Sequence, residues 1–263
     1  MKKIKLIVAT HKDYEFPKDK MYAPIHVGKA IKNNDLGIQG DDTGDNISLK
    51  NQSFCELTAL YWAWKNDFFK DVDYCGLVHY RRYFKGKNIQ LKDEFIASES
   101  ELLTHFSNSN VDILLPKKRN YYIETIEKHY KNAHNEKDLL ETRKIIEELY
   151  PEYLVSFDEL MGQTTIYLFN MSVMKVEDFN NYCEWLFNIL FTLEKRIDIS
   201  DYDTYQKRVF GFLSERLFNI WVMYNELLIK ELDVINIEGE NLFFKGINLL
   251  KRKYLRKVLG KYN

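Results

Sequence analysis

Short apolar runs alternate with a segment of helical periodicity in the first half of the chain, and this alternation constrains the fold most. The runs Lys5–Ala9, Tyr74–Val78 and Val111–Leu115 are each too short for a buried helix, and each ends in polar residues or proline. The segment 54–68, which lies between the first two runs, has apolar residues at helical spacing. Strands separated by helices predict an α/β fold with a mostly parallel central sheet.

The second half of the chain is mainly helical in pattern. One strand is predicted there, in the aromatic-rich stretch Thr165–Val173. No linker divides the chain, so we predict a single domain over residues 1–240, followed by a separate tail over residues 241–263. The predicted helices of this half are Ile123–Asn132, Asp138–Leu149, Asp178–Lys195 and Tyr202–Asn225.

Charge is balanced over the whole chain, with 38 basic and 39 acidic residues, but it is unevenly distributed. The segment 245–263 holds seven basic residues and no acidic one, so acidic residues exceed basic ones by eight in the rest. An acidic body disfavours nucleic acid as a partner, because phosphate binding needs a basic face. Apolar residues recur every three or four positions in the tail, which predicts a basic amphipathic helix on an anionic membrane surface. The alternative is a terminal helix packed on the body.

Neither a membrane-spanning segment nor a secretory leader is expected. No stretch of about 20 apolar residues occurs, and the apolar run near the start ends at Ala9. We therefore expect a cytoplasmic protein that is peripheral at the inner face of the plasma membrane.

A group of cationic side chains directly follows the second apolar run. His79, Arg81 and Arg82 form a concentrated set of donors for a phosphate or diphosphate, because guanidinium groups bind phosphate oxygens in pairs. Ligands bind at the carboxyl ends of parallel strands, which is where these residues are predicted to lie. The alternative is that the two arginines pair with the acidic loop 40–45.

Two acidic segments precede this cationic group in the sequence. The loop Gly40–Ser48 carries Asp41, Asp42 and Asp45, and it fits three roles: substrate contact, turn formation or metal binding. Asp71 and Asp73 match the DxD pattern of metal-binding transferases. They precede the strand that would have to present a metal, so we interpret them as surface turn residues.

Further candidates lie in the helical half. Glu215 is predicted to be half-buried in an apolar helix, where its pKa rises toward the range of a general base, unless it pairs with Arg208 or Arg216. His134 and Asp138 are four residues apart, which places them on one face if a helix begins there.

Asn170 is predicted within the strand Thr165–Val173, among aromatic residues. A polar side chain in that setting needs a partner or a ligand.

Five segments resemble glycosyltransferase family 111, once a domain-of-unknown-function family of bacterial capsule and O-antigen clusters. The resemblance extends from about Lys3 to Trp221. The segments that carry it are Val8–Lys12, Gly40–Ser48, Phe54–Trp62, Gly76–Phe84 and Arg208–Leu217.

The resemblance implies a GT-A-like fold and an inverting galactofuranosyltransferase. Its donor would be UDP-galactofuranose, its product β-linked, and its acceptor an undecaprenyl-diphosphate-linked glycan of capsule, O-antigen or exopolysaccharide synthesis. Metal independence is also implied, although manganese or magnesium stays open. Two other hypotheses are a transferase with a UDP-pyranose donor and a non-catalytic glycan- or phosphate-binding subunit.

Roles follow from such a reaction, which needs a base for the acceptor hydroxyl and cations for the departing UDP. Glu215 is our first candidate for the base, with Asp138 and Asp42 as rivals. The remaining expectations are that Thr10, His11, Lys12, His79, Arg81 and Arg82 bind the nucleotide, that Asp41, Asp42, Asp45 and Asn46 contact the donor sugar, and that His134, Asn170 and Arg208 belong to the site.

Overall fold

The central sheet is built mostly of parallel strands. The computed structural model describes residues 2–107 and 110–238. Strand β1 pairs in parallel with β2 and β3, and β6 pairs in parallel with β10, whereas β9 is antiparallel to both β3 and β6. The predicted α/β fold is confirmed, and each of the three apolar runs forms a strand. The strand order is β10 (Ile229–Leu232), β6 (Ile113–Pro116), β9 (Ser172–Lys175), β3 (Tyr74–His79), β1 (Ile4–Thr10) and β2 (Tyr22–His26).

Antiparallel strands and one helix cover one face of this sheet. Strand β4 (Arg82–Leu91) follows β3 directly and pairs with β5 (Glu94–Ile96) and β11 (Val234–Asn236). Helix α3 (Glu99–Ser107) buries Leu102 and Phe106 on this side. A separate two-stranded sheet is formed by β7 (Arg119–Asn120) and β8 (Thr165–Ile166).

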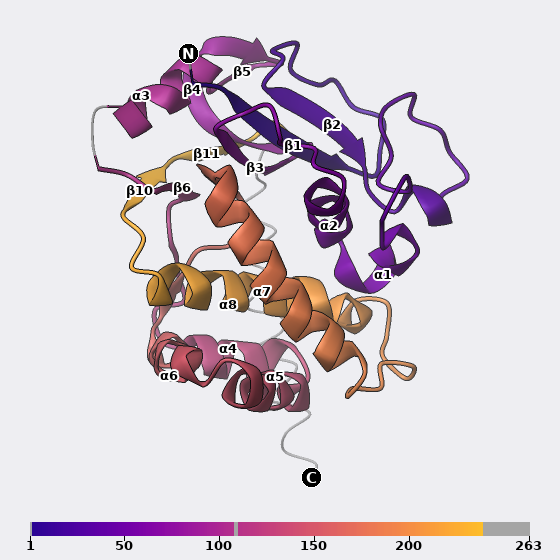
Figure 1. Ribbon diagram of the computed structural model, residues 1–263, viewed down its shortest axis with the longest axis vertical. Helices are drawn as coiled ribbons and strands as arrows, with labels where there is room; N and C mark the ends of the chain where they lie inside the picture. Colours follow the sequence, from indigo (N-terminus) through magenta and orange to yellow (C-terminus); the bar gives the residue numbers. More distant parts are fainter. Residues whose placement is uncertain (1, 108–109, 239–263) are drawn as a thin grey trace.

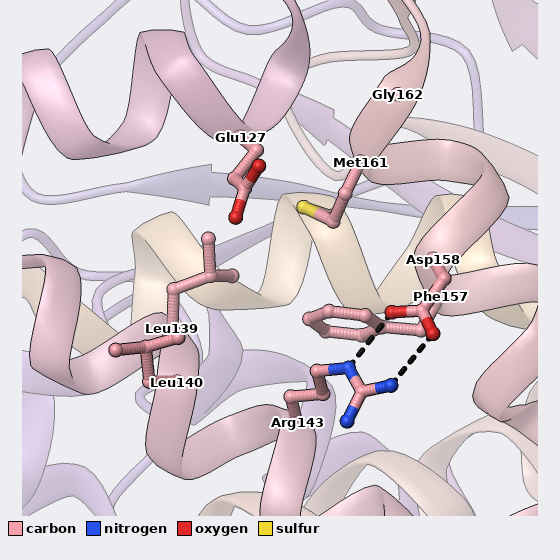
Figure 2. A pocket seen from close by; sticks show the side chains of 8 residues that line it. All are labelled: Glu127, Leu139, Leu140, Arg143, Phe157, Asp158, Met161 and Gly162. Carbon is pink, nitrogen blue, oxygen red and sulfur yellow. Dashed lines mark hydrogen bonds and ion pairs between the residues drawn. The ribbon is translucent and has the colours of Figure 1, made fainter.

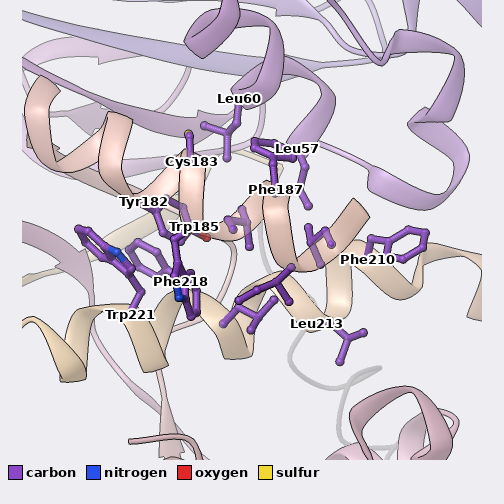
Figure 3. Close-up of a cluster of buried hydrophobic side chains, with 14 of the residues drawn as sticks. Leu57, Leu60, Tyr182, Cys183, Trp185, Phe187, Phe210, Leu213, Phe218 and Trp221 are labelled. Atoms are coloured by element: carbon purple, nitrogen blue, oxygen red, sulfur yellow. The ribbon is translucent and has the colours of Figure 1, made fainter. Parts of the chain in front are cut away.

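The other face is covered by helices in two layers (Figure 1). Helices α7 and α8 lie between the sheet and the group α4–α6. Apolar side chains of α2, α7 and α8, among them Leu60, Phe187 and Phe210, form the core between them (Figure 3). The helices of this side are α1 (Asn51–Phe54), α2 (Leu57–Lys65), α4 (Ile126–Ala133), α5 (Glu136–Leu149), α6 (Leu154–Gly162), α7 (Val176–Glu194) and α8 (Val209–Tyr224). Short 3-10 turns are η1 (Lys29–Ile31), η2 (Ser48–Lys50), η3 (Pro151–Tyr153) and η4 (Gln206–Arg208).

Two predicted elements are interrupted in the structure. The helix predicted over residues 54–68 is divided at Cys55, whose φ of 54° ends α1 before α2 begins. The strand predicted over Thr165–Val173 is also wrong as one element, because Phe169 and Asn170 form a turn with φ values of 78° and 52°. Asn170 therefore lies in a turn before β9 and not within a strand.

His134 and Asp138 do not share a helical face, so that prediction is wrong as well. His134 follows the last residue of α4 in an extended conformation, whereas Asp138 lies in the first turn of α5. The helix predicted to begin at Tyr202 begins at Val209, after the short turn η4.

None of the helices that the structure describes is long and apolar enough to cross a lipid bilayer. The tail predicted over residues 241–263 lies outside the described residues.

Candidate active site

The carboxyl ends of the parallel strands meet the start of β9 at one edge of the sheet. Thr10, His26 and His79 end β1, β2 and β3 at this edge. Because β9 is antiparallel, with Ser172 opposite Leu77, the turn that precedes β9 reaches the same edge. Residues that are far apart in the sequence are thereby brought together, and we call this place the carboxyl edge.

Several basic side chains surround His11 at the carboxyl edge. The ring of His11 stands edge-on to the ring of Tyr80, with centroids 5.5 Å apart. Burial lowers the pKa of His11, and the charges of Lys12, Lys32 and Arg81 lower it further. The predicted residues His11, Lys12 and Arg81 therefore do gather, and the structure adds Lys32.

Arg81 is paired with an acidic residue near the end of the described chain. Its Nη1 lies 3.4 Å from Oε2 of Glu238, whose Oε1 accepts a hydrogen bond from the hydroxyl of Tyr14. This partner lies outside the acidic loop 40–45 that we considered as the alternative. The side chain of Arg81 therefore takes part in an ion pair, as the alternative required, but with a different acidic residue.

His79 and Arg82 both contact Phe169. Nε2 of His79 donates to the carbonyl oxygen of Phe169 at 2.7 Å, and burial lowers the pKa of His79, so the ring is neutral. The guanidinium of Arg82 lies 4.5 Å from the centroid of the Phe169 ring. The structure therefore places His79 as a support of the turn.

Glu215 reaches the same turn from α8. Its Oε1 accepts the backbone N–H of Phe169 at 2.8 Å, and its Oε2 pairs with Arg216 at 3.1 Å. The Glu215 side chain is 19% exposed, and burial raises its pKa despite the opposing charge of Arg216. The carboxyl is half-buried with a raised pKa, as predicted, and the ion pair that we considered as the alternative is present as well, with Arg216.

Glu56 is a member of the site that the sequence reasoning missed. Its Oε1 accepts from Nδ2 of Asn170 at 2.8 Å, and the same Nδ2 is 2.9 Å from the hydroxyl of Ser214. The carboxylate follows Cys55, whose Sγ accepts a hydrogen bond from Nε of Arg208 at 3.3 Å. The sequence did contain one indication of its role: Glu56 is the single acidic residue of the segment Phe54–Trp62, which otherwise has an apolar helical pattern.

The residues of the loop 40–48 differ in how far they are engaged. Asp41 is fully buried and accepts the N–H groups of Gly28 and Lys29 and the hydroxyl of Ser48, so it organises the loop itself.

Asp42 and Asp45 are exposed, and Asp45 accepts from the hydroxyl of Tyr61 at 3.2 Å. The side chain of Asn46 bonds within the loop, to Gly44 and Ser48. Thr10 is buried and donates to the carbonyl of Lys12, which shapes the chain after β1.

His134 belongs to the helical layer beside α8. Its ring stacks on Phe212 with centroids 4.1 Å apart, and Nδ1 lies 3.2 Å from Oε1 of Gln206. Burial lowers the pKa of His134 to about 4, so its ring is neutral at neutral pH. The guanidinium of Arg208 lies 5.3 Å from the centroid of the same Phe212 ring, which connects this layer to Cys55.

Asp138 is buried near this layer with a different partner. It accepts the hydroxyl of Tyr202 at 2.7 Å, and burial raises its pKa.

A cavity of about 220 Å³ lies elsewhere, among α4, α5 and α6 (Figure 2). Leu139, Phe157 and Met161 line it, and the ion pair of Arg143 with Asp158 stands at its side. None of the residues predicted for the site lines this cavity. Its charged groups are that ion pair and Glu127, and it holds none of the cationic residues predicted to bind the donor, so we place the candidate active site at the carboxyl edge.

No group of three or more His, Cys, Asp or Glu side chains within the described residues is arranged to hold a metal ion. Asp71 and Asp73 are exposed in the segment before β3, and Asp73 accepts the N–H of Lys3.

Comparison with known proteins indicates the family and the fold to which the chain belongs. The profile of a family described as "Domain of unknown function (DUF4422)" matches residues 5–226. Comparison with curated proteins gave no match. A solved structure, the apo form of the bifunctional glycosyltransferase WbbM, superposes with a TM-score of 0.78 at 35% identity. That alignment covers 90% of this chain and 46% of the WbbM chain, so this chain spans about half the length of that protein. The superposition on a glycosyltransferase bears out the GT-A-like fold, and the match over most of the sequence shows that the chain belongs to the DUF4422 family.

Proposed function

We propose that the protein is a glycosyltransferase that uses a nucleoside-diphosphate sugar. The observation that carries the proposal is the carboxyl edge, where His11 and Arg81 both lie against the ring of Tyr80. At the same edge Glu215 bonds to the turn that His79 supports. Transfer from such a donor needs both kinds of group: cations for the diphosphate that leaves, and a carboxylate for the proton of the attacking hydroxyl. Membership of DUF4422 and similarity to a bifunctional glycosyltransferase support the same reaction class.

The proposed donor is UDP-galactofuranose and the proposed acceptor an undecaprenyl-diphosphate-linked glycan. Both rest on the resemblance to glycosyltransferase family 111. Capsule, O-antigen or exopolysaccharide synthesis would be the setting. The basic tail 241–263 would hold the enzyme at the anionic membrane surface that contains this lipid, a proposal that rests on its sequence alone.

In the proposed mechanism the acceptor oxygen attacks the anomeric carbon while the bond from that carbon to the UDP oxygen breaks. Glu215 takes the proton of the acceptor hydroxyl, and the electron pair of the broken bond leaves with UDP. Arg81, Arg82 and Lys12 neutralise the charge that develops on the diphosphate. The single displacement inverts the configuration at the anomeric carbon. Asp42, which is exposed, would contact the sugar hydroxyls.

Cationic side chains take the part that a metal plays in other transferases, so the proposed reaction is independent of added metal. Asp138, the rival base, is engaged with Tyr202 in the helical layer. Asp42, the other rival, lies on the exposed loop. Glu215 is therefore the carboxyl to test first.

The deciding experiment is a donor screen with the full chain. UDP-galactofuranose, UDP-galactopyranose and UDP-glucose are each offered with a synthetic lipid-linked acceptor, with and without EDTA, and product is detected by mass. We expect transfer from UDP-galactofuranose alone, unchanged by EDTA, with a β linkage by NMR.

Each other outcome contradicts one part of the proposal. Transfer from a pyranose donor would refute the donor assignment, and loss of activity in EDTA would refute metal independence. Binding of UDP without transfer from any donor would favour a non-catalytic binding subunit.

A further inference from the structure

Cys55, which lies between α1 and α2, has a backbone conformation that L-amino acids rarely adopt. Cys55 has φ 54° and ψ −132°, and a residue in such a region persists only where its surroundings impose it. Here the surroundings do so: the carbonyl of Cys55 accepts from Nδ2 of Asn51 and from the hydroxyl of Thr58, and its Sγ accepts from Arg208. The break divides α1 from α2 and places Glu56 at the start of the second helix.

The turn at Phe169 and Asn170 is held from three other elements. Glu215 on α8 accepts the N–H of Phe169, and His79 on β3 donates to its carbonyl. Glu56 accepts from the side chain of Asn170 at 2.8 Å. Residues other than glycine rarely adopt a positive φ, and Phe169 and Asn170 do so in succession. The turn therefore depends on these three contacts.

The amide of Asn170 can have only one orientation. Its side chain is 5% exposed, and Nδ2 donates to both Glu56 and Ser214. An amide nitrogen must face the carboxylate, because two facing acceptor oxygens would repel each other. Oδ1 is buried and has no hydrogen-bond partner among the described residues, which disfavours the folded state. The bond to the Glu56 carboxylate holds the Nδ2 end of the amide in place.

We propose that Glu56 is a positioning residue that, through Asn170 and the turn, fixes the Glu215 carboxylate where it meets the acceptor hydroxyl. The inference rests on the proposed function, which makes Glu215 the proton acceptor. Glu56 contacts Asn170, Asn170 is continuous with Phe169, and Phe169 donates to Glu215. A displacement at Glu56 is therefore passed on to the base.

Charge gives Glu56 a second effect on the same carboxyl. Burial raises the pKa of Glu215, the Arg216 and Arg208 charges and the Phe169 N–H lower it, and the Glu56 charge raises it. Loss of the Glu56 charge should therefore lower the pKa of Glu215. The titratable and charged groups that face Glu215 are Arg216, Arg208, Glu56, Tyr121 and Cys55.

The test compares two substitutions that separate charge from contact. Glu56→Gln keeps an oxygen that accepts from Asn170 but removes the charge, whereas Glu56→Ala removes both. Glu184→Gln, on an exposed position of α7, is the matched control. The full chain is assayed with UDP-galactofuranose over a range of pH, and UDP affinity is measured by calorimetry.

We expect Glu56→Gln to lower kcat about tenfold and to move the acid limb of the kcat/KM profile to lower pH, with UDP affinity unchanged. Glu56→Ala should lower kcat about 100-fold or more, because the turn loses its support. In a Glu215→Gln background, Glu56→Gln should have no further effect, since it acts through a base that is already absent. The proposal would be overturned if the loss of kcat in the double variant equalled the product of the two single losses. It would also be overturned if the kcat/KM profile of Glu56→Gln did not move to lower pH.

Carboxyl carbon NMR of the protein labelled at glutamate keeps this test separate from the proposed function. The titration of Glu215 is followed without substrate, and it should move to lower pH in Glu56→Gln but not in Glu184→Gln. Absence of transfer and of UDP binding by the natural chain would refute the proposed function alone. An unchanged Glu215 titration in Glu56→Gln would refute the role of Glu56 alone.

Discussion

Replacement of Arg81 by alanine should weaken the binding of UDP by an amount that the structure allows us to bound. A hydrogen bond between a guanidinium and a phosphate contributes about 1.5–3 kcal/mol. Arg81 must first give up its pair with Glu238, whose atoms are 3.4 Å apart on side chains that are 39% and 34% exposed. A pair this exposed stabilises the free protein by about 0–1 kcal/mol. The net loss in Arg81→Ala is therefore about 0.5–3 kcal/mol, or a dissociation constant roughly 2- to 160-fold higher.

Two further variants make this measurement specific. Glu238→Gln removes the competing charge but leaves a side chain that can bond to Tyr14, so UDP should bind up to about fivefold more tightly. Arg143→Ala removes an arginine of similar exposure, which pairs with Asp158 in the helical layer, and should leave UDP affinity unchanged.

Isothermal titration calorimetry with UDP at low ionic strength is the appropriate assay, because added salt screens exposed charges. A folded Arg81→Ala protein that binds UDP as the natural chain does would refute the assignment of Arg81 to the diphosphate. So would an equal loss of affinity in Arg143→Ala.

Three other predictions concern the base, a buried carboxyl and the tail. Glu215→Gln should lower turnover by about 10²–10⁴ while UDP still binds, and turnover near that of the natural chain would make Glu215 structural. Asp138→Asn should raise the free energy of unfolding at neutral pH: burial raises the pKa of Asp138 in the folded state, so its ionised form is disfavoured there. That gain should vanish once the pH falls below the pKa of the unfolded carboxyl, and denaturant titration at both pH values measures it. Deletion of residues 245–263 should abolish sedimentation with anionic liposomes and spare transfer to a short soluble acceptor; equal sedimentation of the truncated protein would contradict this.

The sequence predicted those parts of the fold that depend on local pattern. Lys5–Ala9 and Tyr74–Val78 are apolar on both faces, as strands covered on both sides must be, and both form central strands. Strand β2 was not predicted, because Tyr22–His26 contains a proline and ends in histidine. The break at Cys55 was hidden because apolar residues keep helical spacing across it.

The site was predicted less completely, for a reason that concerns distance along the chain. Arg81 and His11 could be proposed from sequence because each follows an apolar run, and the carboxyl ends of parallel strands meet at one edge. Glu56 was not found, because its partner Asn170 is 114 residues away and nothing in the local pattern of either residue indicates the other. Lys32 lies in a loop, and only the tertiary fold brings its charge near His11.

The antiparallel strand β9 explains why these distant residues meet. In a sheet of parallel strands only the segments that follow each strand reach the carboxyl edge. Strand β9 runs the other way, so the segment before it, with Phe169 and Asn170, lies beside the end of β3. That segment presents a backbone N–H to Glu215 and a carbonyl to His79, and neither bond depends on the side chain of Phe169. The helix α8 is thereby tied to the sheet at the point where Glu215 lies, which would hold the proposed general base in place.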